Sequence, residues 1–266
     1  DSANWDSGSG SYPQQPGDVA AFTNIMETTA ALDVTLPAGV VTCGVVTCAH
    51  ITNTYRINGA GVNASFLVLT NIADTARIEL TGQRASGGAS FVFRNCTIVM
   101  PHHTLIAAPF YASGITFENT SAWEGNAVVT TRSHMTEMYL LVQAPSPNFK
   151  GTVVVAERDL FMRATAALTN AQLIQTVRNT TAYINNREST TRFPLKLENG
   201  TRYRLTSNGA NAHEGALLIE GVVTVQADNT LTLSGAASGT GTVTKTGNGA
   251  ARFTGRPACF AVALAI

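Results

Sequence analysis

The first half of the chain is a succession of short apolar runs separated by turn residues. Each run is about 4–9 residues long, is rich in Val, Ile, Leu, Phe and Thr, and is closed by Gly, Asn, Pro or Ser, as strands are. No segment in this half repeats its apolar residues at the helical spacing. The pattern predicts short strands in the segments DVAAFTN, ALDVTLPAG, VVTCGVVTCAHI, YRINGAG, SFLVLTN, ARIELTG and SFVFRNCTIVM.

The second half keeps the same rhythm after a break at residues 145–148, Pro-Ser-Pro-Asn. One segment, 157–177, has two interpretations. Its Leu160, Phe161, Ala164, Leu168 and Leu173 fall near one face of a helix, whereas its Thr, Arg and Asn residues suit strands with an intervening turn. Strand-like segments then resume as TAYINN, RFPLKLENG, TRYRLTSNG, ALLIEGVVTVQ and NTLTLSG.

The segment 231–255 alternates small, Thr and apolar residues with almost no charge. Glycines stand where the backbone must bend, and Thr, Val and Leu fill the positions between them. Such a segment has too few large side chains to close a core alone, so it must stack on similar segments. Turn signals about 8–12 residues apart also suit a sandwich or a barrel. Strands that are apolar nearly throughout and turns rich in Asn, Ser and Thr favour an all-β parallel β-helix.

Changes of composition divide the chain into four parts. Residues 1–17 are polar and rich in Gly, Ser and Pro, and are predicted to form an irregular N-terminal cap. Residues 18–144 and 145–255 are predicted to be the first and second parts of the solenoid. Residues 256–266 are predicted to form an apolar C-terminal strand.

Composition narrows the classes of partner. Charged residues make up 13% of the chain, and the formal net charge is zero. A nucleic-acid surface would need clustered Lys and Arg, so we predict no nucleic-acid partner. No apolar stretch reaches the length of a membrane helix, so we predict no membrane span. The start, Asp1 to Trp5, has the character of a mature end left after removal of a secretory signal, which predicts a secreted or cell-surface protein.

Four cysteines, Cys43, Cys48, Cys96 and Cys259, are candidates for disulfides, because an even number in a secreted chain favours pairing. A turn at Gly44 would bring Cys43 and Cys48 together, whereas a regular strand would place them on opposite faces. The alternative is that they are buried, unpaired thiols. The spacing does not suit a zinc site.

Candidate catalytic groups are sparse. Acidic residues are scattered, and Glu157 and Asp159 are the nearest to a pair; a solvated turn is the favoured interpretation. His102, His103 and His134 would bind a metal only if they converged, and a polar loop is favoured. We therefore predict no catalytic residue, no cofactor and no metal site. Trp123 and Tyr111 are the two candidates for a sugar-stacking surface, with core packing as the favoured role.

The last nine residues, ACFAVALAI, are almost wholly apolar. A free apolar strand is a liability in a soluble monomer. One hypothesis is that the tail folds back as a last strand of its own chain; the other is that it adds a strand to a neighbouring subunit. The second hypothesis makes Phe260, Val262, Leu264 and Ile266, together with Trp5, candidate subunit contacts.

The segment 239–255, GTGTVTKTGNGAARFTG, resembles the autotransporter-associated β-strand repeat. Ala251 and Phe253 depart from the repeat, which usually has aliphatic residues there. Residues 3–22, 34–61 and 148–162 resemble other segments of such proteins more weakly. The resemblance implies a right-handed parallel β-helix like an autotransporter passenger, secreted or displayed on a bacterial surface. The matching positions are Gly239, Gly241, Val243, Lys245, Gly247, Gly249 and Gly255.

These features together predict a secreted, non-enzymatic structural β-solenoid of the cell surface or extracellular matrix, which assembles head to tail through its ends and its apolar tail. The first alternative is an adhesin that binds glycan or a host surface through a groove lined by aromatic and amide side chains. The second is a polysaccharide-degrading β-helix enzyme, in which acids from neighbouring coils would converge in one cleft.

Overall fold

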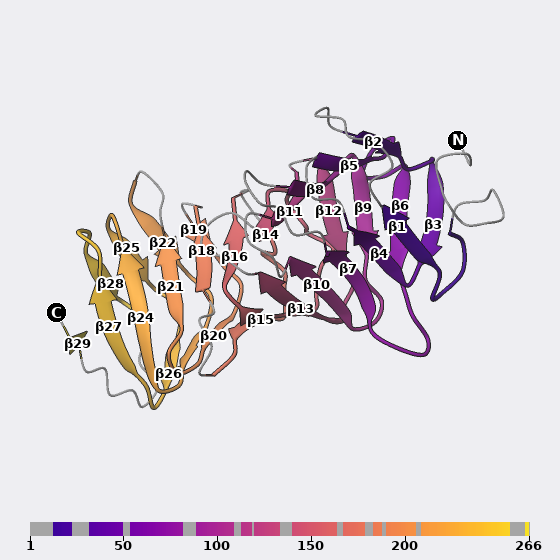
Figure 1. Ribbon diagram of the computed structural model, residues 1–266. Helices are drawn as coiled ribbons and strands as arrows, with labels where there is room; N and C mark the ends of the chain where they lie inside the picture. The colour runs from indigo at the N-terminus through magenta and orange to yellow at the C-terminus, as the bar shows by residue number, and fades with distance from the viewer. Residues whose placement is uncertain are drawn as a thin grey trace.

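The computed structural model describes residues 13–22, 32–49, 54–81, 89–108, 113–118, 120–133, 140–163, 167–178, 183–187, 190–205, 209–255 and 264–265. All named elements of this part of the chain are strands, and every strand pair is parallel. Successive coils of the chain stack into an elongated solenoid (Figure 1), with the first coils at one end and the last at the other. The predicted all-β parallel solenoid is confirmed.

Two long sheets run along the solenoid, each with one strand from each successive coil. Sheet A consists of β1 (Val19–Phe22), β4 (Val45–Cys48), β7 (Ala76–Leu80), β10 (Thr104–Ala108), β13 (Val128–Ser133), β15 (Thr152–Glu157), β17 (Leu173–Thr176), β20 (Leu195–Leu197), β23 (Leu217–Ile219) and β26 (Ala237–Gly239). Sheet B consists of β2 (Leu32–Thr35), β5 (Thr54–Asn58), β8 (Ala89–Arg94), β11 (Ser113–Phe117), β14 (Leu140–Val142), β16 (Asp159–Met162), β18 (Tyr183–Asn186), β21 (Arg202–Leu205), β24 (Val222–Ala227), β27 (Thr242–Thr246) and β29 (Leu264–Ala265).

The third face of the solenoid is split into two short sheets of four strands each. Sheet C consists of β3 (Gly39–Cys43), β6 (Ser65–Leu69), β9 (Cys96–Val99) and β12 (Ser121–Glu124). Sheet D consists of β19 (Thr190–Thr191), β22 (Asn211–His213), β25 (Leu231–Leu233) and β28 (Ala251–Phe253). The described residues between β14 and β15, and between β16 and β17, contain no third-face strand. In the part of the chain that the structure describes, the third face therefore lacks a strand in two successive coils in the middle of the molecule.

Coil length differs along the chain. The partners Val45 and Arg77 in sheet A are 32 positions apart, whereas Leu217 and Ala237 are 20 apart. The last coils keep the 20-residue spacing in all three faces, as Val222 with Thr242 and Leu231 with Ala251 demonstrate. The C-terminal coils therefore superimpose residue on residue, which is the regularity that the glycine-rich pattern of the sequence predicts.

Alternating side chains build a single core. In β6 and β7 every second residue is buried and the others are partly exposed, as expected for strands with one face toward an interior. The inward-facing residues form one continuous apolar cluster from Ala20 in the first coil to Val243 near the last. Strands β13 and β15 pair with one register shift, between Thr131 and Arg132, so the segment 145–148 interrupts the third face and not the core.

Aromatic rings form a continuous ladder through the N-terminal half of this core. Phe93 and Phe117 from neighbouring coils stack with their ring centroids 5.1 Å apart. Phe117 meets the edge of Trp123 at 5.0 Å, and Trp123 meets Phe149 of the next coil at 5.7 Å. Offset and edge-on pairs of this kind add stability beyond the burial of their area. The ladder therefore ties the coils on both sides of β12 together.

Two local expectations have a clear outcome. The described residues of the segment 157–177 form strands with an intervening turn at 167–170, so the strand interpretation is confirmed over the helical one. Residues 13–17, the described part of the predicted cap, contain no strand. The carboxylate of Asp18 accepts hydrogen bonds from the backbone N–H groups of Gln14 and Gln15 at 3.0 and 3.1 Å, which fixes this irregular turn.

Among the described residues, no helix has the length and apolar character needed to cross a bilayer.

Candidate functional site

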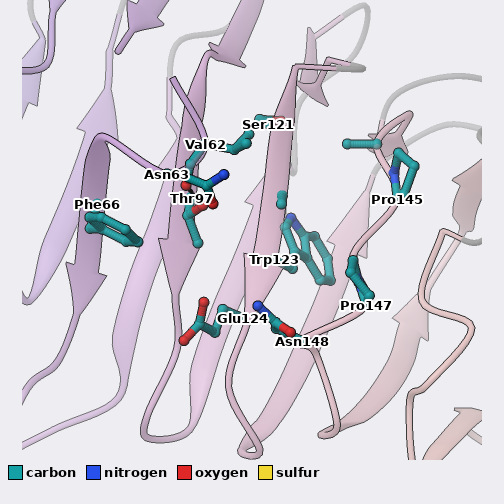
Figure 2. Close-up of a pocket in the computed structure, with 12 residues that line it drawn as sticks. Val62, Asn63, Phe66, Thr97, Ser121, Trp123, Glu124, Pro145, Pro147 and Asn148 are labelled. Atoms are coloured by element: carbon teal, nitrogen blue, oxygen red, sulfur yellow. Dashed lines mark hydrogen bonds between the residues drawn. The ribbon is translucent and has the colours of Figure 1, made fainter. Parts of the chain in front are cut away.

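A groove lies on the third face where sheet C ends. Its first hollow, of about 320 Å³, is bounded by outward-facing residues of β6, β9 and β12 and by the loop that follows β14. A second hollow of about 420 Å³ continues from it toward Asn126 and Lys150, and the two share Glu124 and Asn148. We call the two together the third-face groove. Figure 2 shows Phe66 on one side of it, Pro145 and Pro147 on the other, and Glu124 beside Asn148.

Two prolines explain why the groove forms at this point. Pro145 and Pro147 have no backbone N–H, so the segment that contains them cannot continue the ladder of sheet C. Ser146 lies between them and its Oγ accepts the hydrogen bond of the Trp123 backbone N–H at 3.0 Å. After the loop, the backbones of the two coils meet again at the isolated bridge between Gly125 and Phe149. The loop thus supplies a side-chain hydrogen-bond acceptor to the edge of β12 and forms one side of the groove.

Neighbouring coils supply the floor of the groove. The register of sheet C places Phe66, Thr97 and Ala122 in one row on the outward face of three successive strands. Phe66 and Ala122 are partly exposed, whereas Thr97 is buried and its hydroxyl donates to the Val62 carbonyl. The floor is therefore mainly apolar and contains one accessible aromatic ring.

Five polar side chains that line the groove have no protein partner in the described part of the chain. No described residue forms a hydrogen bond or an ion pair with the carboxylate of Glu124, the ammonium of Lys150, or the amide groups of Asn63, Asn126 and Asn148.

Several outward-facing charges elsewhere are bonded to a neighbour on the same or the next coil. Examples are Arg94 with Glu118 at 2.7 Å and Lys196 with Glu198 at 3.0 Å. The groove combines such free donors and acceptors with apolar surface.

Trp123 lies beneath this groove and not on its surface. Its side chain is fully buried and packs between Phe117 and Phe149, so core packing, the favoured interpretation, is confirmed. Its Nε1 has no hydrogen-bond partner among the described residues. Tyr111, the other candidate sugar-stacking residue, lies outside the described residues. The accessible aromatic residue is Phe66, which the sequence analysis did not single out.

The disulfide prediction is wrong for the three cysteines that the structure describes. Cys43, Cys48 and Cys96 are unpaired and buried, which is the alternative given for them. The register explains this, because Cys43 lies opposite Leu69, Cys48 opposite Phe22 and Leu80, and Cys96 opposite Ser121. Burial raises the pKa of Cys43 and of Cys96 to about 12, so both remain neutral thiols of the core. Cys259 lies outside the described residues.

One predicted subunit contact, Leu264, is described, and its backbone pairs with Val243 of β27 in the same chain. Strand β29 thus forms the last strand of sheet B, as in the fold-back hypothesis for the tail. Trp5, Phe260, Val262 and Ile266 lie outside the described residues, so their roles stay predictions.

The scattered acids and histidines do not come together. Arg158, with a positive φ of 55°, separates Glu157 at the end of β15 from Asp159 at the start of β16. Glu157 is exposed and Asp159 is buried, so the two carboxylates do not share a face. Exposed His103 bonds through Nε2 to the hydroxyl of Thr130 at 2.9 Å, and His134 lies outside the described residues. In the described part of the chain, no three His, Cys, Asp or Glu residues gather as a metal site would require.

A buried polar cluster lies in the C-terminal half. Nδ1 of His213 is bonded to the hydroxyl groups of Thr191 and Tyr203, at 2.9 and 3.3 Å, and the ring of Phe193 lies edge-on to the imidazole. Burial lowers the pKa of His213 from 6.5 to about 4 and raises that of Tyr203 to about 12. Both groups are therefore neutral at pH 7, and the cluster joins sheet D to sheet B by hydrogen bonds without charge.

The lowered pKa of His213 predicts how the stability of the fold depends on pH. The unfolded chain binds a proton near pH 6.5 and the folded chain only near pH 4, so stability falls as pH falls through this interval and levels off below it. The expected loss is about 3 kcal/mol. Denaturant unfolding at pH 7, 6, 5 and 4 measures it, with His213→Phe as the comparison. Equal slopes for the two proteins between pH 6.5 and 5 would contradict the assignment.

Comparison with known proteins finds no family model, no curated protein and no solved structure that matches the chain.

Proposed function

We propose that this chain is a structural, non-enzymatic β-solenoid that associates end to end. The observation that carries the proposal is the open edges of its terminal strands. At one end, β1, β2 and β3 each pair on one side only among the described residues, with β4, β5 and β6. At the other end, β26 and β28 pair only with β23 and β25 among the described residues, while β27 is partly covered by β29.

The direction of the strands supports head-to-tail contact. Because all strands are parallel, the last coil of one copy can present its edges to the first coil of another in the same sense. A head-to-tail contact that does not close into a ring produces a filament. Secretion, or display on a bacterial surface, belongs to the same proposal and is supported by the low charge and by the resemblance of residues 239–255 to an autotransporter repeat.

The two alternatives make different demands on the third-face groove. A polysaccharide-degrading enzyme requires two carboxyl groups across one cleft, and Glu124 is the one acid among the described residues that line this groove. An adhesin requires an aromatic surface with amides beside it, which Phe66, Asn63 and Asn148 supply. The groove thus favours a binding role over a hydrolytic one as the second candidate function.

A proline on an end strand tests self-association. The carbonyl of Ala250 and the N–H of Thr254 bond to β25, so strand alternation directs the N–H of Ala251 away from it, toward the open edge. Ala251→Pro therefore removes an edge donor without removing a bond of the solenoid. We expect filaments of the full chain in negative-stain electron micrographs and short rods of Ala251→Pro, with unchanged far-UV circular dichroism.

A second variant, truncated after Gly255, distinguishes a contact made by the end strands from a contact made by the tail. If truncation abolished the filaments and Ala251→Pro did not, the subunit contact would lie in the tail, with the candidates Phe260, Val262, Leu264 and Ile266. Monodisperse rods of the full chain over a wide range of concentration would refute end-to-end association.

A further inference from the structure

We propose that the third-face groove binds a neutral oligosaccharide. This inference does not depend on end-to-end association, because the groove lies on the side of the solenoid and the terminal strands lie at its ends. It is carried by three features of the groove: its size and direction, its combination of apolar and uncommitted polar groups, and the balance of its charges.

The size and direction of the groove suit a chain-like ligand. Its two hollows, of about 320 and 420 Å³, are each within the range of small-molecule sites. Its floor crosses β6, β9 and β12 and reaches the loop after β14, which is three coil spacings, or about 14 Å at the usual distance between strands. A ligand of several linked rings can therefore lie along the solenoid axis and contact four successive coils.

The surface of the groove matches the two faces of a sugar ring. A pyranose has an apolar C–H face and an edge of hydroxyl groups, each of which both donates and accepts hydrogen bonds. Phe66 and Pro147 offer apolar surface on opposite sides of the groove. The amides of Asn63 and Asn148 donate and accept, and the carboxylate of Glu124 accepts. No described residue occupies these three polar groups.

Charge selects a neutral ligand. Glu124 and Lys150 line the same hollow, so the fixed charges of the groove cancel. An anionic sugar would meet the carboxylate of Glu124, and a cationic ligand would meet the ammonium of Lys150. A charged ligand would therefore be attracted by one of these residues and repelled by the other, whereas the hydroxyl groups of a neutral sugar can bond to both.

The structure disfavours an extended peptide as the occupant. A peptide that adds to a sheet needs an open strand edge. The N–H groups of Trp123 and Gly125 on the edge of β12 are already bonded, to Ser146 Oγ at 3.0 Å and to the Asn148 carbonyl at 3.4 Å. The groove therefore offers side-chain groups to a ligand, and little backbone.

A blocking variant with a matched control tests the proposal. Ala122 and Ala212 are both partly exposed alanines on the outward face of a third-face strand, in β12 and β22. Ala122→Arg fills the groove, and Ala212→Arg places the same side chain on sheet D, away from it. The probe is an array of neutral and acidic oligosaccharides, followed by calorimetric titration of the best neutral glycan with the full chain and both variants.

We expect a Kd for that glycan below about 1 mM, at least about tenfold weaker binding by Ala122→Arg, and no change in Ala212→Arg. Phe66→Ala and Asn148→Ala should each weaken binding about fivefold or more. In a Trp5→Phe background Trp123 is the one remaining tryptophan, and its emission should change on binding because it lies beneath the floor. Binding of acidic glycans alone, equal binding by Ala122→Arg, or no glycan binding at millimolar concentration would each overturn the proposal.

Discussion

Replacing Gly235 with alanine should unfold the last coils of the solenoid while the N-terminal coils stay folded. A Cβ at this position would overlap the carbonyl oxygen of Gly215 in the coil below. The same relation joins Gly255 to Gly235 and Gly215 to Phe193, so the glycines form a column in which backbones of successive coils touch. The neighbour is backbone held by the ladder, so it cannot move aside without breaking the register. We expect a loss of more than about 3 kcal/mol from the C-terminal coils.

Hydrogen exchange locates this effect. Stability in a solenoid is close to a sum over coils and their interfaces, so a defect in one coil is felt mainly by its neighbours. Amides of β23 to β28 should lose protection in Gly235→Ala, and those of β4 to β9 should keep theirs. Gly209→Ala is the matched control, because a Cβ there meets no atom within 4 Å. Equal protection in Gly235→Ala and Gly209→Ala would show that the column does not set the register.

The sequence predicts the C-terminal coils better than the rest because their coil length is constant. A fixed 20-residue offset brings residues of the same kind together, as with Gly215, Gly235 and Gly255, so the pattern is visible in the chain itself. In the N-terminal half the offset varies, from 36 residues between Thr54 and Ser90 to 23 between Leu32 and Tyr55. The strands of this half can still be recognised from the sequence, but the strands with which they pair cannot.

The way that successive coils and sheets are arranged also explains why the groove could not be located from the sequence and why two interpretations of the cysteines stayed open. Phe66 lies in the run Ser-Phe-Leu-Val-Leu, where both alternating sets contain apolar residues, so alternation alone does not say which set faces outward. Glu124 and Asn148 meet in the groove only because Asn148 falls one coil later, beside β12. Cys43 and Cys48 are close in the chain, but they end strands of different sheets on either side of Gly44. The buried bonds of His213 to Thr191 and Tyr203 likewise join residues that only the register brings together.

Replacing Phe117 with alanine should destabilise the central coils by about 3–5 kcal/mol, the usual cost of removing a fully buried aromatic ring. The ring is completely buried, stacks on Phe93 of the preceding coil and meets Trp123 edge-on. Its loss leaves a cavity that rigid strands on three sides cannot close, and it breaks the aromatic ladder at its centre. We expect a lower denaturation midpoint and faster exchange in β8, β11 and β12.

Phe66→Ala is the matched comparison, because Phe66 is a partly exposed ring on the outward face of β6 and lies outside the ladder. It should cost about 1 kcal/mol of stability or less, since its removal leaves no buried cavity. The two substitutions therefore separate the two roles that aromatic residues have in this chain. Phe117→Ala should lower stability greatly, and Phe66→Ala should keep the fold and weaken the glycan bound in the groove. If Phe66→Ala destabilised the protein as much as Phe117→Ala, Phe66 would belong to the core, and the groove would lose its aromatic surface.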